Sequence, residues 1–166
     1  PLDTATDPGD RGCVRIRWFA AFNGAPPANV KFWGIGVSVS ANNEVSVGMS
    51  SGSTAVVFAA TTSAGAAVTF TGALGTFVPV LGTEYELECN WDLTDERTGI
   101  SFYVNGVQTG TLTMSSVSPT FGARNSLTLG RTPNSAPAIR GWYRDVIMFN
   151  TVQHTAATYI SGTYDV

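Results

Sequence analysis

Residues 82–113 read GTEYELECNWDLTDERTGISFYVNGVQTGTLT, and this stretch decides the fold. Apolar and polar side chains alternate through 84–92, which is the pattern of a strand with one buried face. Further along, Asn105-Gly106 separates two β-rich segments, and these two residues tolerate the positive φ angles of a type I′ turn. The spacing therefore predicts a tight hairpin between 99–105 and 107–114.

Most of the chain after residue 12 follows the same pattern. Short β-rich segments alternate with turn-forming residues, as in NGAPPAN at 23–29, and no segment has the periodicity of a helix. We predict an all-β fold, a two-sheet antiparallel β-sandwich, with an irregular segment at 1–12 and a single domain at 13–166. The expected strands are 13–22, 30–40, 44–50, 54–60, 66–72, 84–92, 99–105, 107–114, 126–131 and 140–149.

Composition argues against several classes of function. The net charge is −3 and Lys31 is the single lysine, so we expect no nucleic-acid partner. No apolar run approaches the roughly 18 to 20 residues of a membrane span, and residues 1–12 lack the features of a signal peptide, so we expect no membrane insertion. The chain begins with Pro1 rather than Met, which suggests a processed product or a piece of a longer polypeptide.

Two cysteines, Cys13 and Cys89, could in principle form one disulfide. In 13–22 the apolar side chains alternate from Val14 onward, which leaves Cys13 on the opposite face, whereas Cys89 falls with the apolar residues of its own strand. The alternation therefore favours two thiols that point to different faces, with Cys89 buried.

Several short motifs follow one another in a set order, namely Tyr85 with Trp91-Asp92, Val104-Asn105-Gly106, LTLG at 127–130 and GWYRDVIMFN at 141–150. Their order over residues 82–150 resembles the second half of a laminin-G-like domain of the concanavalin A-like lectin/glucanase superfamily. VRIRWFAAFN at 14–23 is similar to an early strand of that family. The resemblance implies a concanavalin A-like jelly roll.

Glu84, Glu86 and Glu88 stand at alternate positions of the strand at 84–92. Their spacing is similar to the E-x-D-x-E run of laminarinase-type glycosidases, in which two carboxyl groups about 5 to 5.5 Å apart act as nucleophile and acid. No aromatic cleft residues flank the run here, so we expect a solvated strand face and no enzyme activity. If 13–22 is the neighbouring strand, the glutamates can pair with Arg15 and Arg17.

Exposed aromatic rings beside polar loops are the usual sugar-binding groups of this class. Trp33, Trp142, Tyr143 and Tyr103 are candidates because they flank glycine or loop segments, although core packing would also explain them.

Calcium is a possible cofactor, because the resemblance implies a rim site in many relatives. Asp145 matches the second acid of the family motif, while Arg144 replaces the first. Further oxygen ligands could come from Asp3, Asp7, Asp10 or Asp165, and the alternative is that Asp145 accepts backbone N–H groups in a turn. The single histidine, His154, has no cluster of metal ligands around it in the sequence.

Taken with the resemblance, these features favour a non-enzymatic binding or adhesion module on an extracellular or virion surface, with a glycan as its partner. A structural or decorating domain that packs on neighbouring protein subunits of a virion or extracellular assembly is the first alternative, and a laminarinase-type glycosidase is the second. The scarcity of lysine and the strands rich in small residues suit an assembly surface as well as a lectin.

Overall fold

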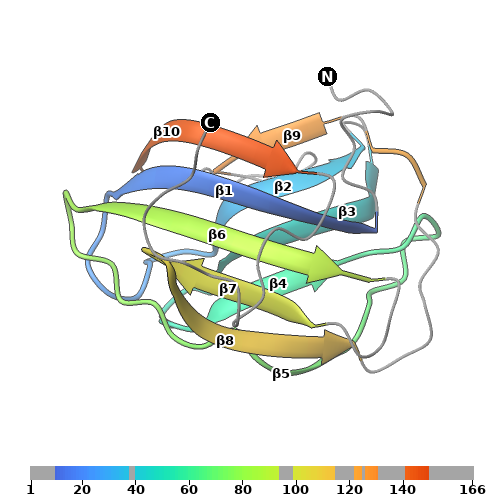
Figure 1. Ribbon diagram of the computed structural model, residues 1–166, viewed down its shortest axis with the longest axis horizontal. Helices are drawn as coiled ribbons and strands as arrows, with labels where there is room; N and C mark the ends of the chain where they lie inside the picture. The colour runs from blue at the N-terminus through green and yellow to red at the C-terminus, as the bar shows by residue number, and fades with distance from the viewer. Residues whose placement is uncertain are drawn as a thin grey trace.

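The computed structural model describes residues 10–37, 40–93, 99–114, 122–124, 126–130 and 141–149, which form two antiparallel sheets and no helix (Figure 1). The predicted β-sandwich is confirmed, and each expected strand has a counterpart. The six-stranded sheet has the order β10 (Gly141–Phe149), β1 (Arg11–Ala20), β6 (Glu84–Asp92), β7 (Ile100–Val104), β8 (Val107–Met114) and β5 (Phe70–Ala73). The four-stranded sheet has the order β4 (Val56–Ala60), β3 (Ser40–Met49), β2 (Val30–Val37) and β9 (Ser126–Leu129).

Strand β1 lies between β6 and β10, although these strands are far from it in the sequence. Its pairing with β6 runs without interruption from Arg11 opposite Asp92 to Phe19 opposite Glu84. Strand β1 is thus the element that joins an early, a central and a late segment of the chain into one sheet.

The described residues contain no helix long and apolar enough to cross a membrane.

The core fills the space between the two sheets and is rich in aromatic rings. Trp18 of β1 lies at its centre, with ring centroids 5.2 Å from Phe32 and 6.2 Å from Phe77. Phe77 in turn makes an edge contact with Tyr85 at 4.9 Å. Such edge-on contacts add to the hydrophobic gain from burying the rings.

A β-bulge in β2 buries Trp33, which rules out this residue as a surface sugar-binding group and agrees with the alternative of core packing. Lys31 pairs with Gly48 and Trp33 pairs with Val47, so Phe32 is an extra residue in the ladder. Two consecutive rings therefore point into the core, where simple alternation would place one outside. Trp33 is 1% exposed, and its ring lies 5.3 Å from that of Trp91.

The predicted hairpin turn is confirmed. Asn105 and Gly106 have φ angles of 49° and 80°, as a type I′ turn requires. Asn105 also bonds to the neighbouring strand, because its N–H donates to the Glu86 carbonyl and its Oδ1 accepts from the Glu86 N–H, both at 2.8 Å. The turn thereby anchors β7 and β8 to β6.

Both cysteines are free and buried, and they point to different faces of the sheet, as the alternation predicts. Cys89 belongs to the core between the sheets, whereas Cys13 lies opposite Asn90 on the other face. Burial raises the pKa of both thiols, and the nearby Glu88 carboxylate raises it further. Both side chains therefore stay protonated at neutral pH.

We predict that neither thiol reacts with Ellman's reagent in the folded protein at about pH 8, because the reagent needs an accessible thiolate. In guanidinium chloride, both thiols should react quickly. Absorbance of the released thionitrobenzoate measures both states. Rapid labelling of either cysteine in the folded protein would contradict this account of the two sites.

Candidate ligand-binding face

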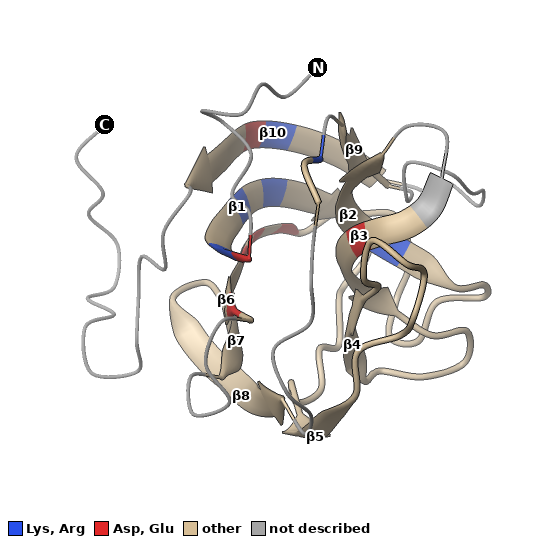
Figure 2. Ribbon diagram, turned by 90° about the vertical axis from the view of Figure 1, so that its right-hand side faces the viewer, with Lys and Arg blue, Asp and Glu red and all other residues tan. Residues whose placement is uncertain are grey.

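Strands β10, β1 and β6 align their side chains in rows on the face of the six-stranded sheet that points away from the core, called the outer face below. Directly paired residues of antiparallel strands share a face, so each row crosses all three strands. Figure 2 shows the resulting basic positions on β1 and β10 and the acidic ones on β6. In order, the rows are Trp142, Phe19, Glu84; Arg144, Arg17, Glu86; Ile147, Arg15, Glu88; and Phe149, Cys13, Asn90.

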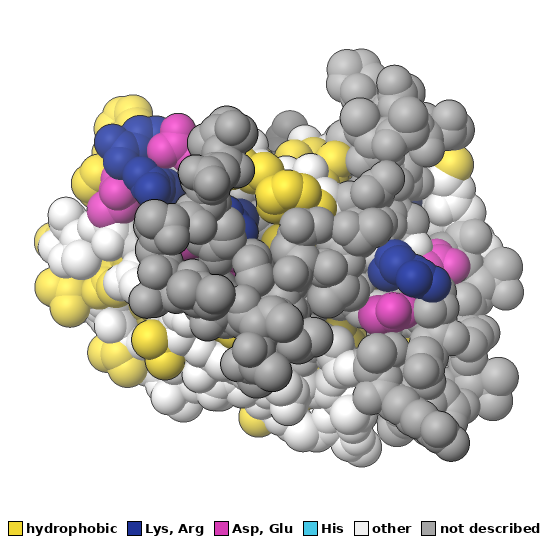
Figure 3. All heavy atoms as spheres, in the orientation of Figure 1, with side chains coloured by type: hydrophobic (Ala, Val, Ile, Leu, Met, Phe, Trp, Pro, Cys, Tyr) yellow, Lys and Arg dark blue, Asp and Glu magenta, His cyan; other side chains and the backbone are white. Residues whose placement is uncertain are grey.

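The first two rows and Asp145 form the exposed end of this face. Arg144 donates from Nη2 to Glu84 Oε1 at 3.1 Å, and its Nε lies 3.3 Å from Asp145 Oδ2. Arg17 lies between two carboxylates, with Nε 3.8 Å from Glu86 Oε2 and Nη1 3.6 Å from Asp145 Oδ2. In Figure 3 this region is the dark blue surface flanked by magenta at the upper left.

A second β-bulge places Asp145 in this cluster. Arg15 pairs with Ile147 and Arg17 with Arg144, so Asp145 and Val146 together oppose a single residue of β1. Asp145 has a φ of 53°, a left-handed conformation that Asp and Asn tolerate better than most side chains. The bulge brings its carboxylate beside two arginines.

The last two rows form the buried end. Arg15 Nε donates to Glu88 Oε2 at 2.9 Å, and Asn90 Nδ2 donates to Glu88 Oε1 at 2.7 Å. The side chains of Arg15 and Glu88 are only 4% and 1% exposed. The Arg15 guanidinium also lies 5.9 Å from the centroid of the Phe149 ring.

The solvated-face prediction is therefore wrong for Glu88, because a buried arginine and a buried amide surround it. Glu84 and Glu86 keep 29% and 21% of their side-chain surface exposed. The expected adjacency of the arginine and glutamate strands is confirmed, since Arg15 pairs with Glu88 and Arg17 with Glu86.

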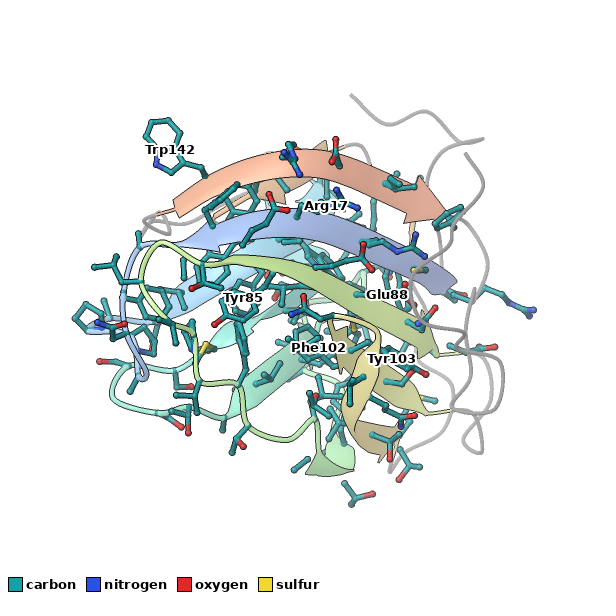
Figure 4. All side chains as sticks on the ribbon, turned by 60° about the vertical axis from the view of Figure 1, so that its left-hand side comes forward. Arg17, Tyr85, Glu88, Phe102, Tyr103 and Trp142 are labelled. Carbon is teal, nitrogen blue, oxygen red and sulfur yellow. The ribbon has the colours of Figure 1, made fainter. Side chains whose placement is uncertain are left out.

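Of the four aromatic candidates, Trp142 alone presents a largely exposed ring, at 80% exposure (Figure 4). It projects from the start of β10, beside the exposed end. Tyr103 pairs with Glu88 and is 1% exposed, so the expectation of a surface ring is wrong there as well as at Trp33. Tyr143 is half-buried, packs against the core, and has the pKa of its hydroxyl raised by burial.

The described residues do not fit a calcium site. They contain no group of three or more acidic, histidine or cysteine side chains able to hold a metal ion, and Asp145 is engaged by Arg17 and Arg144. Asp10 is described and belongs to no such group, and its carbonyl accepts a hydrogen bond from Leu93 N–H at 2.7 Å. The remaining proposed ligands, Asp3, Asp7 and Asp165, and also His154, lie outside the described residues.

A small pocket of about 100 Å³ lies on the four-stranded sheet, at the paired ends of β2 and β3. Lys31, Gly48 and Val57 are among its lining residues. Its volume is well below the roughly 300 to 1,000 Å³ of typical ligand pockets. The outer face is therefore the better candidate site.

Sequence reasoning did not assign a ligand role to Arg17, Arg144 or Phe19, which complete the exposed end. The sequence did indicate that the arginines of 13–22 share one face of their strand and that the glutamates of 84–92 share one face of theirs, because each set occupies alternate positions. No local signal places Arg144 beside them, since that depends on the pairing of β10 with β1.

Comparisons with known proteins are consistent with this architecture. A family model described as the concanavalin A-like lectin/glucanases superfamily matches residues 20–158. No protein among the curated sequences matches the chain.

Three solved structures similar in fold are sialidases. The NanB sialidase of Streptococcus pneumoniae has a TM-score of 0.66 and 17% identity, over 95% of this chain and 25% of the enzyme. The leech intramolecular trans-sialidase gives 0.63 and 10%, over 96% and 24%. The Trypanosoma rangeli sialidase gives 0.52 and 14%, over 87% and 21%. The chain thus spans about a quarter of these enzymes or less, and at such identities the likeness concerns the fold alone.

The two ends of the outer face should differ in their contribution to stability. Glu88→Gln leaves the buried Arg15 charge without its carboxylate, so we expect a loss of about 3 kcal/mol or more in the free energy of unfolding. Glu84→Gln, which removes a more exposed partner of Arg144, should cost less than about 1 kcal/mol. Guanidinium chloride denaturation followed by tryptophan fluorescence measures both, and equal losses would contradict the assignment.

Proposed function

The chain belongs to the concanavalin A-like lectin/glucanase superfamily, and we propose that it is a non-enzymatic module that binds a glycan on the exposed end of the outer face. The observation that carries this proposal is Trp142, whose ring is 80% exposed beside a cluster of charged side chains. A sugar ring offers apolar C–H groups on one face and hydroxyl groups at its edge. A flat aromatic ring next to fixed donors and acceptors matches both.

The polar groups of the exposed end are held in place before any ligand arrives. Glu84 accepts a hydrogen bond from Arg144, and Asp145 links Arg144 with Arg17. Preorganised groups lose less conformational entropy on binding than free side chains do. Carboxylates accept hydrogen bonds from sugar hydroxyls, and guanidinium groups donate to them, so the cluster can orient a ring stacked on Trp142.

The same geometry argues for binding rather than hydrolysis. A retaining glycosidase needs a carboxyl group that stays protonated beside a carboxylate that attacks the sugar. Here each of the three glutamates of β6 faces an arginine, namely Arg144, Arg17 and Arg15. Each of these glutamates is thus already engaged by an arginine, which leaves it poorly placed to attack or protonate a sugar.

The relatives in fold are consistent with a carbohydrate role but do not define it. They are sialidases of which this chain corresponds to about a quarter or less. A glycan-binding module of that size could serve a longer polypeptide by holding it on a glycan-bearing surface. The superfamily name itself includes both lectins and glucanases.

A second candidate function rests on a different surface. Val78, Val80, Leu81 and Val107 are 61%, 54%, 58% and 69% exposed, near the same end of the six-stranded sheet. The loop that carries the first three is fixed by hydrogen bonds, including those from Val80 N–H to Tyr85 Oη and from Leu81 N–H to Asn23 Oδ1. Fixed exposed apolar groups favour packing against a neighbouring protein subunit, as an assembly module would need.

We predict that a glycan array will detect saccharide binding by the 166-residue chain, and that Trp142→Ala will weaken it about tenfold or more. Loss of the stacking surface removes roughly 1.5 kcal/mol or more of apolar burial, which corresponds to that factor. Trp142→Phe should retain part of the affinity, and Val107→Ala serves as a control outside the charged cluster. Array measurements with calcium and with a chelator test the cofactor expectation in the same experiment.

Circular dichroism of each variant checks that the sandwich is folded. Absence of binding to every saccharide, by a folded protein, would contradict the glycan proposal. Self-association or capture of a subunit that is lost with Leu81→Ser would then favour the assembly function.

A further inference from the structure

We infer that the exposed end selects neutral glycans over carboxylated ones, an inference that rests on the proposed function of this face. Its charged groups are Glu84, Glu86, Asp145, Arg17 and Arg144. Among the residues that the structure describes, three carboxylates stand against two guanidinium groups, which leaves one negative charge in excess. The next row adds nothing to this balance, because Arg15 and Glu88 are paired and buried.

Arg144 directs two of its five N–H groups at carboxylates, because Nη2 donates to Glu84 at 3.1 Å and Nε lies 3.3 Å from Asp145. A ligand carboxylate bound by the remaining N–H groups would lie close to these two acids, which would repel it. The two acids therefore offset part of the attraction that Arg144 offers to an anionic sugar.

Arg17 is the more available donor, because its two carboxylate contacts, at 3.6 and 3.8 Å, are longer than hydrogen bonds. The side chain is 44% exposed, so its N–H groups can reach a ligand oxygen. The flanking Glu86 and Asp145 would repel a ligand carboxylate placed there. A pair of sugar hydroxyls avoids this repulsion, since a hydroxyl can accept from Arg17 and donate to an adjacent acid.

Glu86 and Asp145 are therefore the residues that determine this selectivity. The repulsion between one such partly exposed charge and a nearby ligand carboxylate should lower the affinity by a factor of about five to ten. Two such charges together should favour the neutral ligand clearly. The effect should also weaken as salt concentration rises, because these charges are partly exposed.

The test compares lactose with 3′-sialyllactose, and N-acetyllactosamine with its 3′-sialylated form, on an array and by titration calorimetry with the full chain. The variants Glu86→Gln and Asp145→Asn each remove one charge with little change of shape, and Asn tolerates the left-handed backbone of residue 145. Glu44→Gln, on β3 of the other sheet, changes the net charge equally and serves as the control.

We expect the wild-type protein to bind the neutral member of a pair at least tenfold more tightly. Each of the two site variants should reduce this ratio about fivefold, and Glu44→Gln should leave it unchanged. Equal or tighter binding of the sialylated member would overturn this inference and leave the proposed glycan function standing. Failure to bind any saccharide on the array, neutral or sialylated, would overturn both.

Discussion

The pairing of β1 between β6 and β10 is the constraint on which the rest of the structure depends. It joins residues 11–20 to strands that begin at residues 84 and 141, so it closes contacts between distant parts of the chain. Because the register with β6 is continuous, Arg15 and Arg17 of β1 face Glu88 and Glu86 of β6. Both the aromatic core on one face and the charged rows on the other follow from this single alignment.

The charged rows change character along the strands. At one end, Arg15, Glu88 and Asn90 form a buried network of hydrogen bonds. A buried ion pair adds little net stability, but removing one partner lowers the free energy of unfolding strongly. Substitutions at this end should therefore destabilise the fold. At the other end, the same residue types are half-exposed and stand beside Trp142. One sequence pattern thus supports rigidity at one end and leaves groups available for a ligand at the other.

Membership of the superfamily accounts for the sandwich fold but does not determine which ligand the chain binds. The sandwich is shared with parts of sialidases at 10 to 17% identity, a level at which surface side chains differ freely. Ligand choice therefore depends on which groups a chain displays on its outer face. In this chain, Arg17 lies between Glu86 and Asp145, and from this arrangement we infer a preference for neutral hydroxyl groups over anions.

The sequence by itself determined the all-β sandwich, the Asn105-Gly106 turn, the family and the opposite faces of the two cysteines. The family was indicated by the resemblance of its ordered motifs, whereas the other features follow from period-two alternation and turn chemistry, which act between residues close in the chain. Only the tertiary structure decided that Trp33 is buried, that Glu88 is enclosed and that Asp145 joins Arg17. The first and last depend on β-bulges, and the second on contacts across the outer face. Bulges and burial arise from the register of strands far apart in the sequence, which a local pattern does not encode.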